Sequence, residues 1–263
     1  MKVSIITVAY NSAATIRDTI ESVRAQEHPN IEHIVVDGVS SDGTVDIVRS
    51  YGSDIAHFIS EPDTGIYDAM NKGIALATGE VVGILNSDDL YAHSQVISHV
   101  VAALERSSAD CCFADLVYVS GTQLDKVVRY YSSASFHPGR FAWGWMPAHP
   151  TVFLKRRAYE AHGVFRTDFR IAADFELMIR FLACHQLPYV YVPEVWVKMR
   201  TGGISTSGMA SNLLLNREIV RACRDNGINT SLPQVMIKYF SKLFQLVRRP
   251  ARTVGDPNTS ASG

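Results

Sequence analysis

The sequence predicts an α/β fold in which a mostly parallel sheet is flanked by helices and followed by an amphipathic helical segment. Over residues 3–104, apolar runs rich in β-branched residues alternate with segments whose apolar residues recur at helical spacing. Short clusters of Asp, Asn, Gly and Ser follow three of the apolar runs. Residues 232–249 place apolar side chains on one side of a helical wheel and polar or basic ones on the other.

The composition limits the classes of protein to which the chain can belong. Of its 263 residues 47% are hydrophobic, which excludes general disorder and suits one large domain with or without a smaller appendage. The 25 Lys and Arg residues against 26 Asp and Glu give a formal net charge of −1, so broad electrostatic binding of nucleic acid is not expected. The four cysteines form no CxxC pair, which indicates reduced, intracellular thiols.

Membrane-spanning and export signals are not expected in this sequence. Its apolar runs fall short of the roughly 18–20 residues that a membrane span needs. The N-terminal residues enter a strand pattern at once, without the apolar core and cleavage site of a signal peptide. We therefore expect a cytoplasmic protein.

The first half is expected to alternate strands with helices. The predicted strands are residues 3–9, 31–36, 55–59 and 81–85. The predicted helices are residues 13–23 (with Ser12 as a cap), 44–50, 66–77 and 96–104. Such alternation forms a parallel sheet, and ligands bind such sheets at the carboxyl ends of the strands. We therefore expect the polar clusters after Ala9, Val36 and Leu85 to form one shared site.

The second half is less regular. Its predicted strands are residues 112–119, 127–131 and 189–199, and its predicted helices are residues 154–162, 174–184 and 211–226. A loop-rich stretch at residues 132–150 contains Trp143, Trp145 and His149. The tryptophans can stack on a sugar ring or fill the core, and a histidine before a proline is more often a packed loop residue than a catalytic one.

The segment 37–44 leads from a predicted strand into a predicted helix. Glycines such as Gly38 let the backbone approach a ligand closely, and the Asp37 carboxylate can accept hydrogen bonds from a base or a ribose. The alternative is a solvated turn in which Ser41 or Asp42 caps the helix.

The segment Asn86-Ser87-Asp88-Asp89 ends the fourth predicted strand. Two carboxylates in that position are costly to bury unless they meet a cation or hydrogen-bond donors. Hard oxygen ligands suit Mg²⁺ or Mn²⁺, which also bind diphosphate oxygens. The alternative is that Asp88 or Asp89 caps the next helix.

Asp174 is an acid flanked by apolar residues at the start of a predicted helix. Burial can tune the pKa of such a carboxylate for work as a general base, although a plain helix cap is the commoner role.

Other chemistries are disfavoured by missing motifs. The chain has no GxGxxG after the first strand, no GxxxxGK[ST] and no GxSxG, which argues against a dinucleotide dehydrogenase, a phosphate-loop NTPase and a nucleophile-elbow hydrolase.

Together these motifs resemble those of the family 2 inverting glycosyltransferases with the GT-A fold, of the bacterial surface-polysaccharide type. The resemblance covers about residues 2–206. It is carried by the segments 4–11, 35–44, 61–73, 85–89, 149–151 and 172–174, in that order along the chain. It implies a catalytic domain at residues 1–206, with a nucleotide-binding half at 1–105 and an acceptor half at 106–206. Helices at 207–249 and a disordered tail at 250–263 would follow.

The resemblance also implies roles for individual residues. The nucleotide-sugar donor would be held by residues from several loops: Thr7, Ala9, Tyr10, Asp37, Gly38, Asp68, Lys72, Ser87, Asp89 and Arg200. Asn71 and Gly73 would shape its pocket. Asp88 would bind Mn²⁺ or Mg²⁺ together with Asn86, which stands where the family has the first Asp of its Asp-x-Asp motif. Arg200–Ser205 would be a mobile loop over the donor.

Asp174 matches the catalytic base of the family, preceded here by Ala173 in place of the usual Glu. It would deprotonate an acceptor hydroxyl that attacks the anomeric carbon opposite the leaving diphosphate, while Trp143, Trp145 and His149 would lie on the acceptor side. The expected function is transfer of a sugar, UDP-linked in the donor, to a glycan or lipid-linked saccharide. The alternatives are a catalytically silent nucleotide-sugar-binding scaffold and a sugar nucleotidyltransferase.

The C-terminal segment points to a membrane surface. Between Leu232 and Arg252 the sequence has five basic residues and no acidic one. We expect residues 232–252 to lie on an anionic membrane, at the inner face of the plasma membrane, with the apolar side of the helix buried. The alternative is a helix packed on the domain with its basic residues in water.

Overall fold

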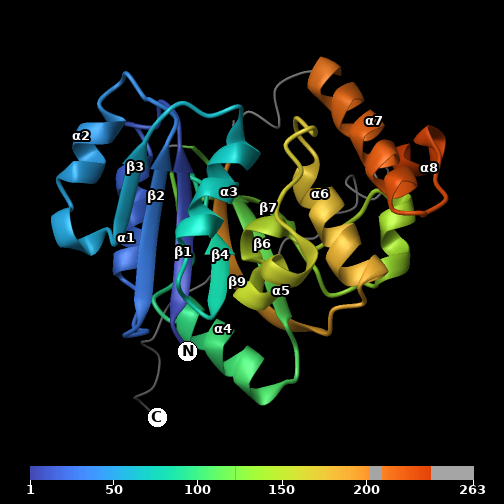
Figure 1. The fold of residues 1–263 in the computed structure, drawn as a ribbon, viewed down its shortest axis with the longest axis horizontal. Helices are drawn as coiled ribbons and strands as arrows, with labels where there is room; N and C mark the ends of the chain where they lie inside the picture. The colour runs from blue at the N-terminus through green and yellow to red at the C-terminus, as the bar shows by residue number, and fades with distance from the viewer. Residues whose placement is uncertain (122, 202–208, 238–263) are drawn as a thin grey trace, which may run out of the picture.

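The computed structural model describes residues 1–121, 123–201 and 209–237 (Figure 1). Its strands form one curled sheet with the order β3-β2-β1-β4-β8-β6-β9-β5, and β7 pairs with β6 outside this path. The α/β fold class is therefore confirmed. The tail at 250–263, most of the amphipathic segment 232–252 and the predicted boundary at residue 206 lie outside the described residues.

The first half of the sheet is parallel, as expected. Its strands are β1 (Val3–Ala9), β2 (Ile31–Asp37), β3 (His57–Ser60) and β4 (Val81–Ile84). β1 pairs in parallel with β2 and β4, and β2 with β3. The helices between them are α1 (Ile16–Arg24), α2 (Thr44–Arg49) and α3 (Ile66–Leu76). The carboxyl ends of β1, β2 and β4 thus meet at one edge.

The second half of the sheet is mixed, so the predicted mostly parallel arrangement holds only for part of it. β6 (Cys111–Val119) pairs in parallel with β9 (Tyr189–Arg200) but antiparallel with β7 (Val127–Tyr131) and β8 (Phe153–Lys155). β8 also joins β4 antiparallel, and β5 (Leu90–Tyr91) joins β9 antiparallel. The predicted helix 154–162 is wrong at its start, because Leu154 pairs with Val82 and Cys111 and α5 (Arg156–His162) begins afterwards.

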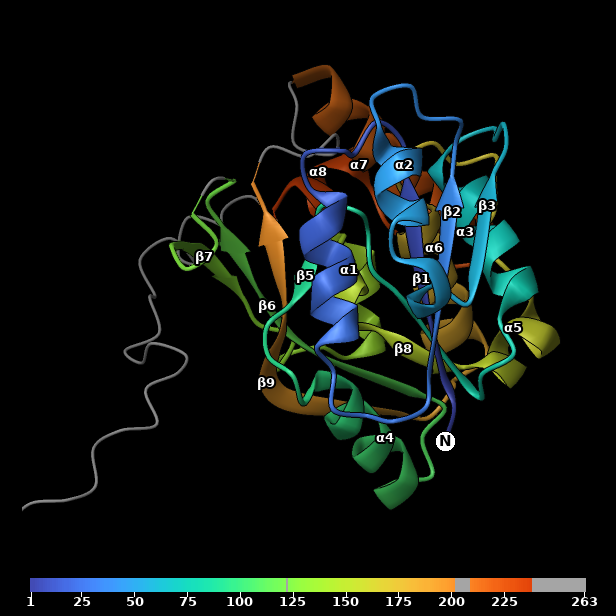
Figure 2. The same ribbon diagram turned by 90° about the vertical axis from the view of Figure 1, so that its left-hand side faces the viewer.

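Alternating side chains of β1 enter the cores on the two faces of the sheet. Ile6 and Val8 join the cluster that contains the buried residues of α3. Val3 and Ile5 join the cluster of α4 (Val96–Arg106), on the other face, where α1 and α2 also pack (Figures 1 and 2). This period of two is the geometry of a strand buried on both faces.

The C-terminal helices pack on the same core as α3. α6 (Ala173–Met178) continues into a π-helical segment (Ile179–Cys184), and α7 (Met209–Asp225) and α8 (Leu232–Met236) lie beside it in Figure 1. Ile219 of α7 and Val235 of α8 are buried in that core. The first turn of the predicted amphipathic segment therefore packs on the domain. In the described part of the chain, no helix combines the length and hydropathy needed to cross a membrane.

Candidate active site

Three loops meet at the carboxyl edge of the parallel strands. Asn11 Oδ1 accepts a hydrogen bond from the Ser41 backbone N–H at 2.9 Å, which ties the loop after β1 to the loop after β2. Ser12 Oγ and Ser87 Oγ lie 2.8 Å apart, which ties it to the loop after β4. Ser12 therefore links the loops. It is not the cap of α1, which begins at Ile16 and has Thr15 as its N-cap residue. The expected convergence of the three polar clusters is found.

Asp37 organises the loop after β2 from inside. Its fully buried carboxylate accepts hydrogen bonds from Ser40 N–H at 3.0 Å, from the Ser40 hydroxyl, and from Ser60 Oγ at 2.7 Å. The neighbouring Gly38 lies close to Asp63, because a Cβ there would lie 2.5 Å from Asp63 Oδ2, so a side chain would force the Asp63 carboxylate to move. The alternative, a cap at Ser41 or Asp42, is met only in part: Gly43 is the residue before α2, and Asp42 Oδ1 accepts the Thr44 N–H at 3.1 Å.

The predicted base-binding residues of β1 differ in accessibility. The Tyr10 side chain is 66% exposed beside this loop. Thr7 is buried, and its hydroxyl lies 3.0 Å from Nε2 of His33. Burial lowers the pKa of His33 to about 4, so this imidazole is neutral. Ala9 is also buried, and its carbonyl accepts the Gly38 N–H at 2.9 Å.

α3 connects the two halves of the chain. The side-chain amide of Asn71 donates to the Phe165 carbonyl at 2.8 Å and accepts the Phe165 N–H at 2.9 Å. Gly73 allows close packing on β1, since a Cβ there would lie 2.3 Å from Cγ2 of Ile6. Lys72 Nζ lies 2.9 Å from a Glu61 oxygen and 3.8 Å from Asp68. Asp68 in turn accepts the Thr64 N–H at 3.0 Å, so both charged residues border the 61–64 loop.

The loop after β4 holds buried oxygen atoms that have no hydrogen-bond partner in the described part of the chain. Within the described residues, Asn86 Oδ1 and both carboxylate oxygens of Asp89 are buried and accept no hydrogen bond. Burial raises the pKa of Asp88, and burial together with the charge of Asp88 raises the pKa of Asp89 well above its usual range. Neither Asp caps α4, because β5 intervenes. Uncompensated buried oxygens of this kind are what a bound divalent cation would neutralise.

Arg200, at the end of β9, braces this loop. Its side chain is only 9% exposed. It donates to the backbone oxygens of Asp88 and Gly121, both at 3.0 Å, and to the Asp18 carboxylate. Most of the predicted mobile loop after it falls at 202–205, outside the described residues.

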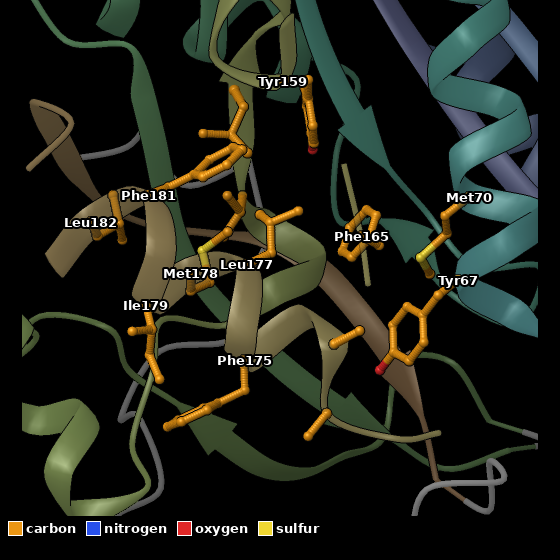
Figure 3. Packing of buried hydrophobic residues seen from close by; sticks show 14 of the residues in the cluster. Tyr67, Met70, Tyr159, Phe165, Phe175, Leu177, Met178, Ile179, Phe181 and Leu182 are labelled. Atoms are coloured by element: carbon orange, nitrogen blue, oxygen red, sulfur yellow. The ribbon is translucent and has the colours of Figure 1, made fainter. Parts of the chain in front are cut away.

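A pocket joins the loop after β4 to the segment that carries Asp174. Asn86, His149 and Asp174 line it together. Its other lining residues are apolar or aromatic: Met70, Ile84, Val152, Leu154, Tyr159, Phe165, Leu177 and Met178. Figure 3 shows Met70 on α3 facing Phe165, with Leu177 and Met178 on α6. The pocket thus has a polar end at Asn86, His149 and Asp174 and an apolar wall elsewhere.

Asp174 lies in the first turn of α6 and is not its cap, which is Ala172. Its side chain is 17% exposed, with Oδ2 3.2 Å from Nδ1 of His149. Oδ1 accepts the Phe175 N–H at 2.8 Å and faces the Tyr67 hydroxyl at 3.3 Å. Burial and the charge of Asp174 raise the pKa of Tyr67, so the phenol remains a donor. These contacts orient the carboxylate, as a general base requires.

Tyr67 and Glu218 are two positioning residues that the sequence analysis missed. Tyr67, which projects from α3 in Figure 3, also donates to the Ile171 carbonyl at 2.5 Å. Glu218 of α7 accepts the backbone N–H groups of Arg170, Ile171 and Ala172 at 2.8, 2.8 and 2.9 Å. Tyr67 lies in the segment 61–73 that carries the family resemblance, which could have pointed to it. No motif in the neighbouring sequence points to Glu218.

Removing the Glu218 carboxylate is expected to loosen the segment before Asp174. The Glu218→Ala substitution leaves three amide groups without their acceptor, which should cost about 1–3 kcal/mol of stability. Amide hydrogen exchange at residues 170–172 should accelerate, as read by mass spectrometry. Glu160→Ala, at an exposed ion pair on α5, is the matched control. Unchanged exchange at 170–172 would mean that this segment is held by other contacts.

The two tryptophans have different surroundings. Trp145 is stacked on Tyr131, with ring centroids 5.7 Å apart, and also contacts Phe136 and Arg140. It therefore packs against the core. Trp143 is 47% exposed, so its indole is available to a ligand.

The chain matches known proteins over most of its length. The family model described as glycosyl transferase family 2 matches residues 4–163. An uncharacterized glycosyltransferase of Mycobacterium tuberculosis is 34% identical over 183 residues, 68% of each chain. The putative teichuronic acid biosynthesis glycosyltransferase TuaG of Bacillus subtilis is 36% identical over 141 residues, covering 51% of this chain and 55% of TuaG.

Solved structures agree with the fold. Residues 1–349 of Staphylococcus aureus TarS, crystallised with UDP, match with a TM-score of 0.67 at 18% identity, over 92% of this chain and 72% of that one. The mannosyltransferase PcManGT of Pyrobaculum calidifontis matches with a TM-score of 0.59 at 19% identity, over 93% of this chain and 80% of that one. This chain therefore belongs to glycosyl transferase family 2 and is a glycosyltransferase with the GT-A fold.

Proposed function

We propose that this enzyme transfers a sugar from a UDP-linked donor to a hydroxyl group of a glycan or lipid-linked saccharide, with inversion at the anomeric carbon. One observation carries the proposal: the pocket that holds Asp174 is also lined by Asn86, whose oxygen has no partner among the described residues. A base and a diphosphate-binding loop on one pocket are what a single displacement requires.

On the donor side, the nucleobase would lie against the exposed Tyr10 ring and the loop that Asp37 holds in place. The ribose and diphosphate would then run toward Ser87, Asp88 and Asp89. Asp68 and Lys72 would border this path from the start of α3. Arg200 would help by holding the loop after β4 and by adding positive charge near the phosphates.

Asn86, Asp88 and Asp89 fit a divalent cation, because Asn86 Oδ1 and the Asp89 oxygens are buried without a hydrogen-bond partner among the described residues, and burial raises the pKa of both carboxylates despite the nearby Arg200 charge. Bound there, Mn²⁺ or Mg²⁺ would supply charge stabilisation for the departing diphosphate. Asn86 contributes a neutral oxygen where a third carboxylate would bind the ion more tightly. The activity should therefore depend strongly on the concentration of the metal ion.

On the acceptor side, Asp174 would take the proton of the attacking hydroxyl. His149 and Tyr67 hold its two oxygens, so the carboxylate faces the pocket in one orientation. The exposed Trp143 ring would stack on an acceptor sugar. Attack from this side, opposite the diphosphate, inverts the anomeric centre.

Ligands of related structures support the choice of donor and metal. TarS has been crystallised with UDP and with UDP-GlcNAc, and PcManGT with GDP-Man and Mn²⁺. The name of TuaG, which refers to teichuronic acid biosynthesis, supports a polysaccharide acceptor. We extend these properties to this chain as part of the proposal.

A panel of nucleotide sugars tests the proposed function. The purified protein is heated with UDP-glucose, UDP-galactose, UDP-GlcNAc or GDP-mannose, each with and without Mn²⁺ or Mg²⁺. A UDP-sugar should raise the melting temperature only when the metal is present, and slow donor hydrolysis should release UDP. No shift with any donor would overturn the proposal, and binding without hydrolysis or transfer would favour a silent scaffold.

We further propose that the enzyme acts at the cytoplasmic face of the plasma membrane, bound through the basic C-terminal segment. Deleting residues 238–263 removes five basic residues, each worth about 1 kcal/mol near an anionic surface, and leaves α8 in place. Co-sedimentation with vesicles containing phosphatidylglycerol should fall at least about tenfold. Neutral phosphatidylcholine vesicles are the control. If the truncated protein sediments like the full chain, the segment is not the anchor.

A further inference from the structure

A second group of metal-ligating side chains lies away from the active-site pocket. His93 follows β5, His99 is on α4, and Glu194 is on β9. One ligand atom of each lies within 4.8 Å of the other two. None of the three lines the pocket that contains Asp174.

The sheet itself brings these residues together. β5 pairs with β9 through Leu90–Lys198 and Tyr91–Val197, and the Ala92 N–H then bonds the Trp196 carbonyl at 2.9 Å. This pairing sets the turn after β5 beside the irregular part of β9. His99 follows on the first turns of α4, and its ring centroid lies 5.6 Å from that of His93. The cluster thus lies on β9, on α4 and on the turn that joins β5 to α4.

Neighbouring groups orient the three side chains. Nδ1 of His99 lies 2.6 Å from Oε2 of Glu194. The indole N–H of Trp196, a fully buried residue, donates to the same oxygen at 3.1 Å. Nδ1 of His93 accepts the Gln95 N–H at 3.3 Å, which places the ring proton on Nε2, so a metal ion at Nε2 would require this long hydrogen bond to break and the proton to move to Nδ1. The Trp196 contact is an outer contact of the kind that fixes the orientation of carboxylate ligands in metal sites.

We propose that His93, His99 and Glu194 bind one zinc ion. Two imidazoles and one carboxylate form a donor set that zinc prefers and magnesium does not, with a fourth position left for water. The ion would take the place of the proton now shared between His99 and Glu194. Their 2.6 Å separation would then open to roughly 3.3 Å, the spacing of two ligands in a tetrahedral site. This inference does not depend on the donor or the acceptor of the enzyme.

Zinc at this position would join the two strands that flank the donor loop. β5 starts directly after Asp89, and β9 ends at Arg200, which bonds the Asp88 carbonyl. An ion that clamps the far end of β5 to β9 would therefore steady the frame on which Asp88 and Asp89 are placed. The expected consequence is a more stable protein.

The test uses the full-length, tag-free protein after removal of metal with a chelator. Titration calorimetry with zinc chloride should show one tight site per chain, and saturation should raise the melting temperature by about 5 °C or more. Cobalt(II) should bind the same site and give the visible absorption of a tetrahedral ion. Magnesium should produce neither effect.

Variants locate the site and separate it from the donor loop. His99→Ala, His93→Ala and Glu194→Gln should each weaken zinc binding by at least about tenfold. His57→Ala, an exposed histidine on β3, and Asp88→Ala should leave it unchanged. If His99→Ala misfolds by circular dichroism, the other two variants decide. The proposal is overturned if zinc does not bind stoichiometrically, or if binding survives in the folded variants of the cluster.

Discussion

Replacing Asp174 with Asn is expected to lower kcat by roughly 100- to 10,000-fold and to leave the affinity for the donor almost unchanged. Asparagine keeps the size of the side chain and an oxygen that can accept the Phe175 and Tyr67 hydrogen bonds. It cannot take a proton from the acceptor hydroxyl. The effect should therefore fall on the chemical step, measured as initial rates at saturating donor and acceptor, with donor affinity from calorimetry.

The matched control for Asp174→Asn is Asp54→Asn. Asp54 is a half-exposed carboxylate that pairs with Arg24, and it does not line the pocket. Its replacement should leave both the rate and the donor affinity near those of the unmodified enzyme. Full turnover by the Asp174→Asn enzyme would show that the proton leaves by another route. Loss of donor binding would show instead that Asp174 maintains the structure of the pocket.

The parts of the site that could be predicted are those whose signal is local. Asp37 and the Asn86–Asp89 segment follow apolar strands directly, and parallel strands present their carboxyl ends at one edge. The convergence of these loops follows from the order of strands and helices alone. The position of Asp174 does not follow from the order of elements, because strands and helices do not alternate simply between residues 106 and 173. Its role as the base is an expectation that rests on the family resemblance.

The parts that could not be predicted depend on pairing between distant segments. Leu154 lies in a strand of three residues, too short to show a period of two, and it was assigned to a helix because it precedes one. β5 has only two residues and exists because β9 offers a free edge. The Glu218 carboxylate accepts hydrogen bonds from backbone N–H groups 46 to 48 residues earlier in the chain. Such contacts leave no mark on neighbouring residues of the sequence.

Replacing Asp88 with Ala is expected to lower kcat/KM by about 100- to 1,000-fold, because it removes the charged ligand that the diphosphate loop offers to a metal ion. The same change should not destabilise the metal-free protein. Asp88 is one of two buried carboxylates whose pKa values are raised by burial, and its charge raises the pKa of Asp89 further. Mn²⁺ binding, followed by electron paramagnetic resonance with UDP present, should weaken while the metal-free melting temperature holds or rises. A fall in that temperature would indicate a structural role instead.

A substitution that adds a carboxylate, Asn86→Asp, should move both Mn²⁺ affinity and the metal-free melting temperature in the opposite direction. A third carboxylate beside Asp88 and Asp89 adds uncompensated negative charge where Asn86 Oδ1 is already buried without a partner among the described residues. The metal-free protein should therefore melt at a lower temperature. With Mn²⁺ the added charge becomes favourable, and the affinity for the ion should rise about tenfold, or about 1.4 kcal/mol. If Mn²⁺ affinity is the same in the Asn86→Asp and unmodified proteins, Asn86 does not face the cation, and Asp88 with Asp89 must hold it alone.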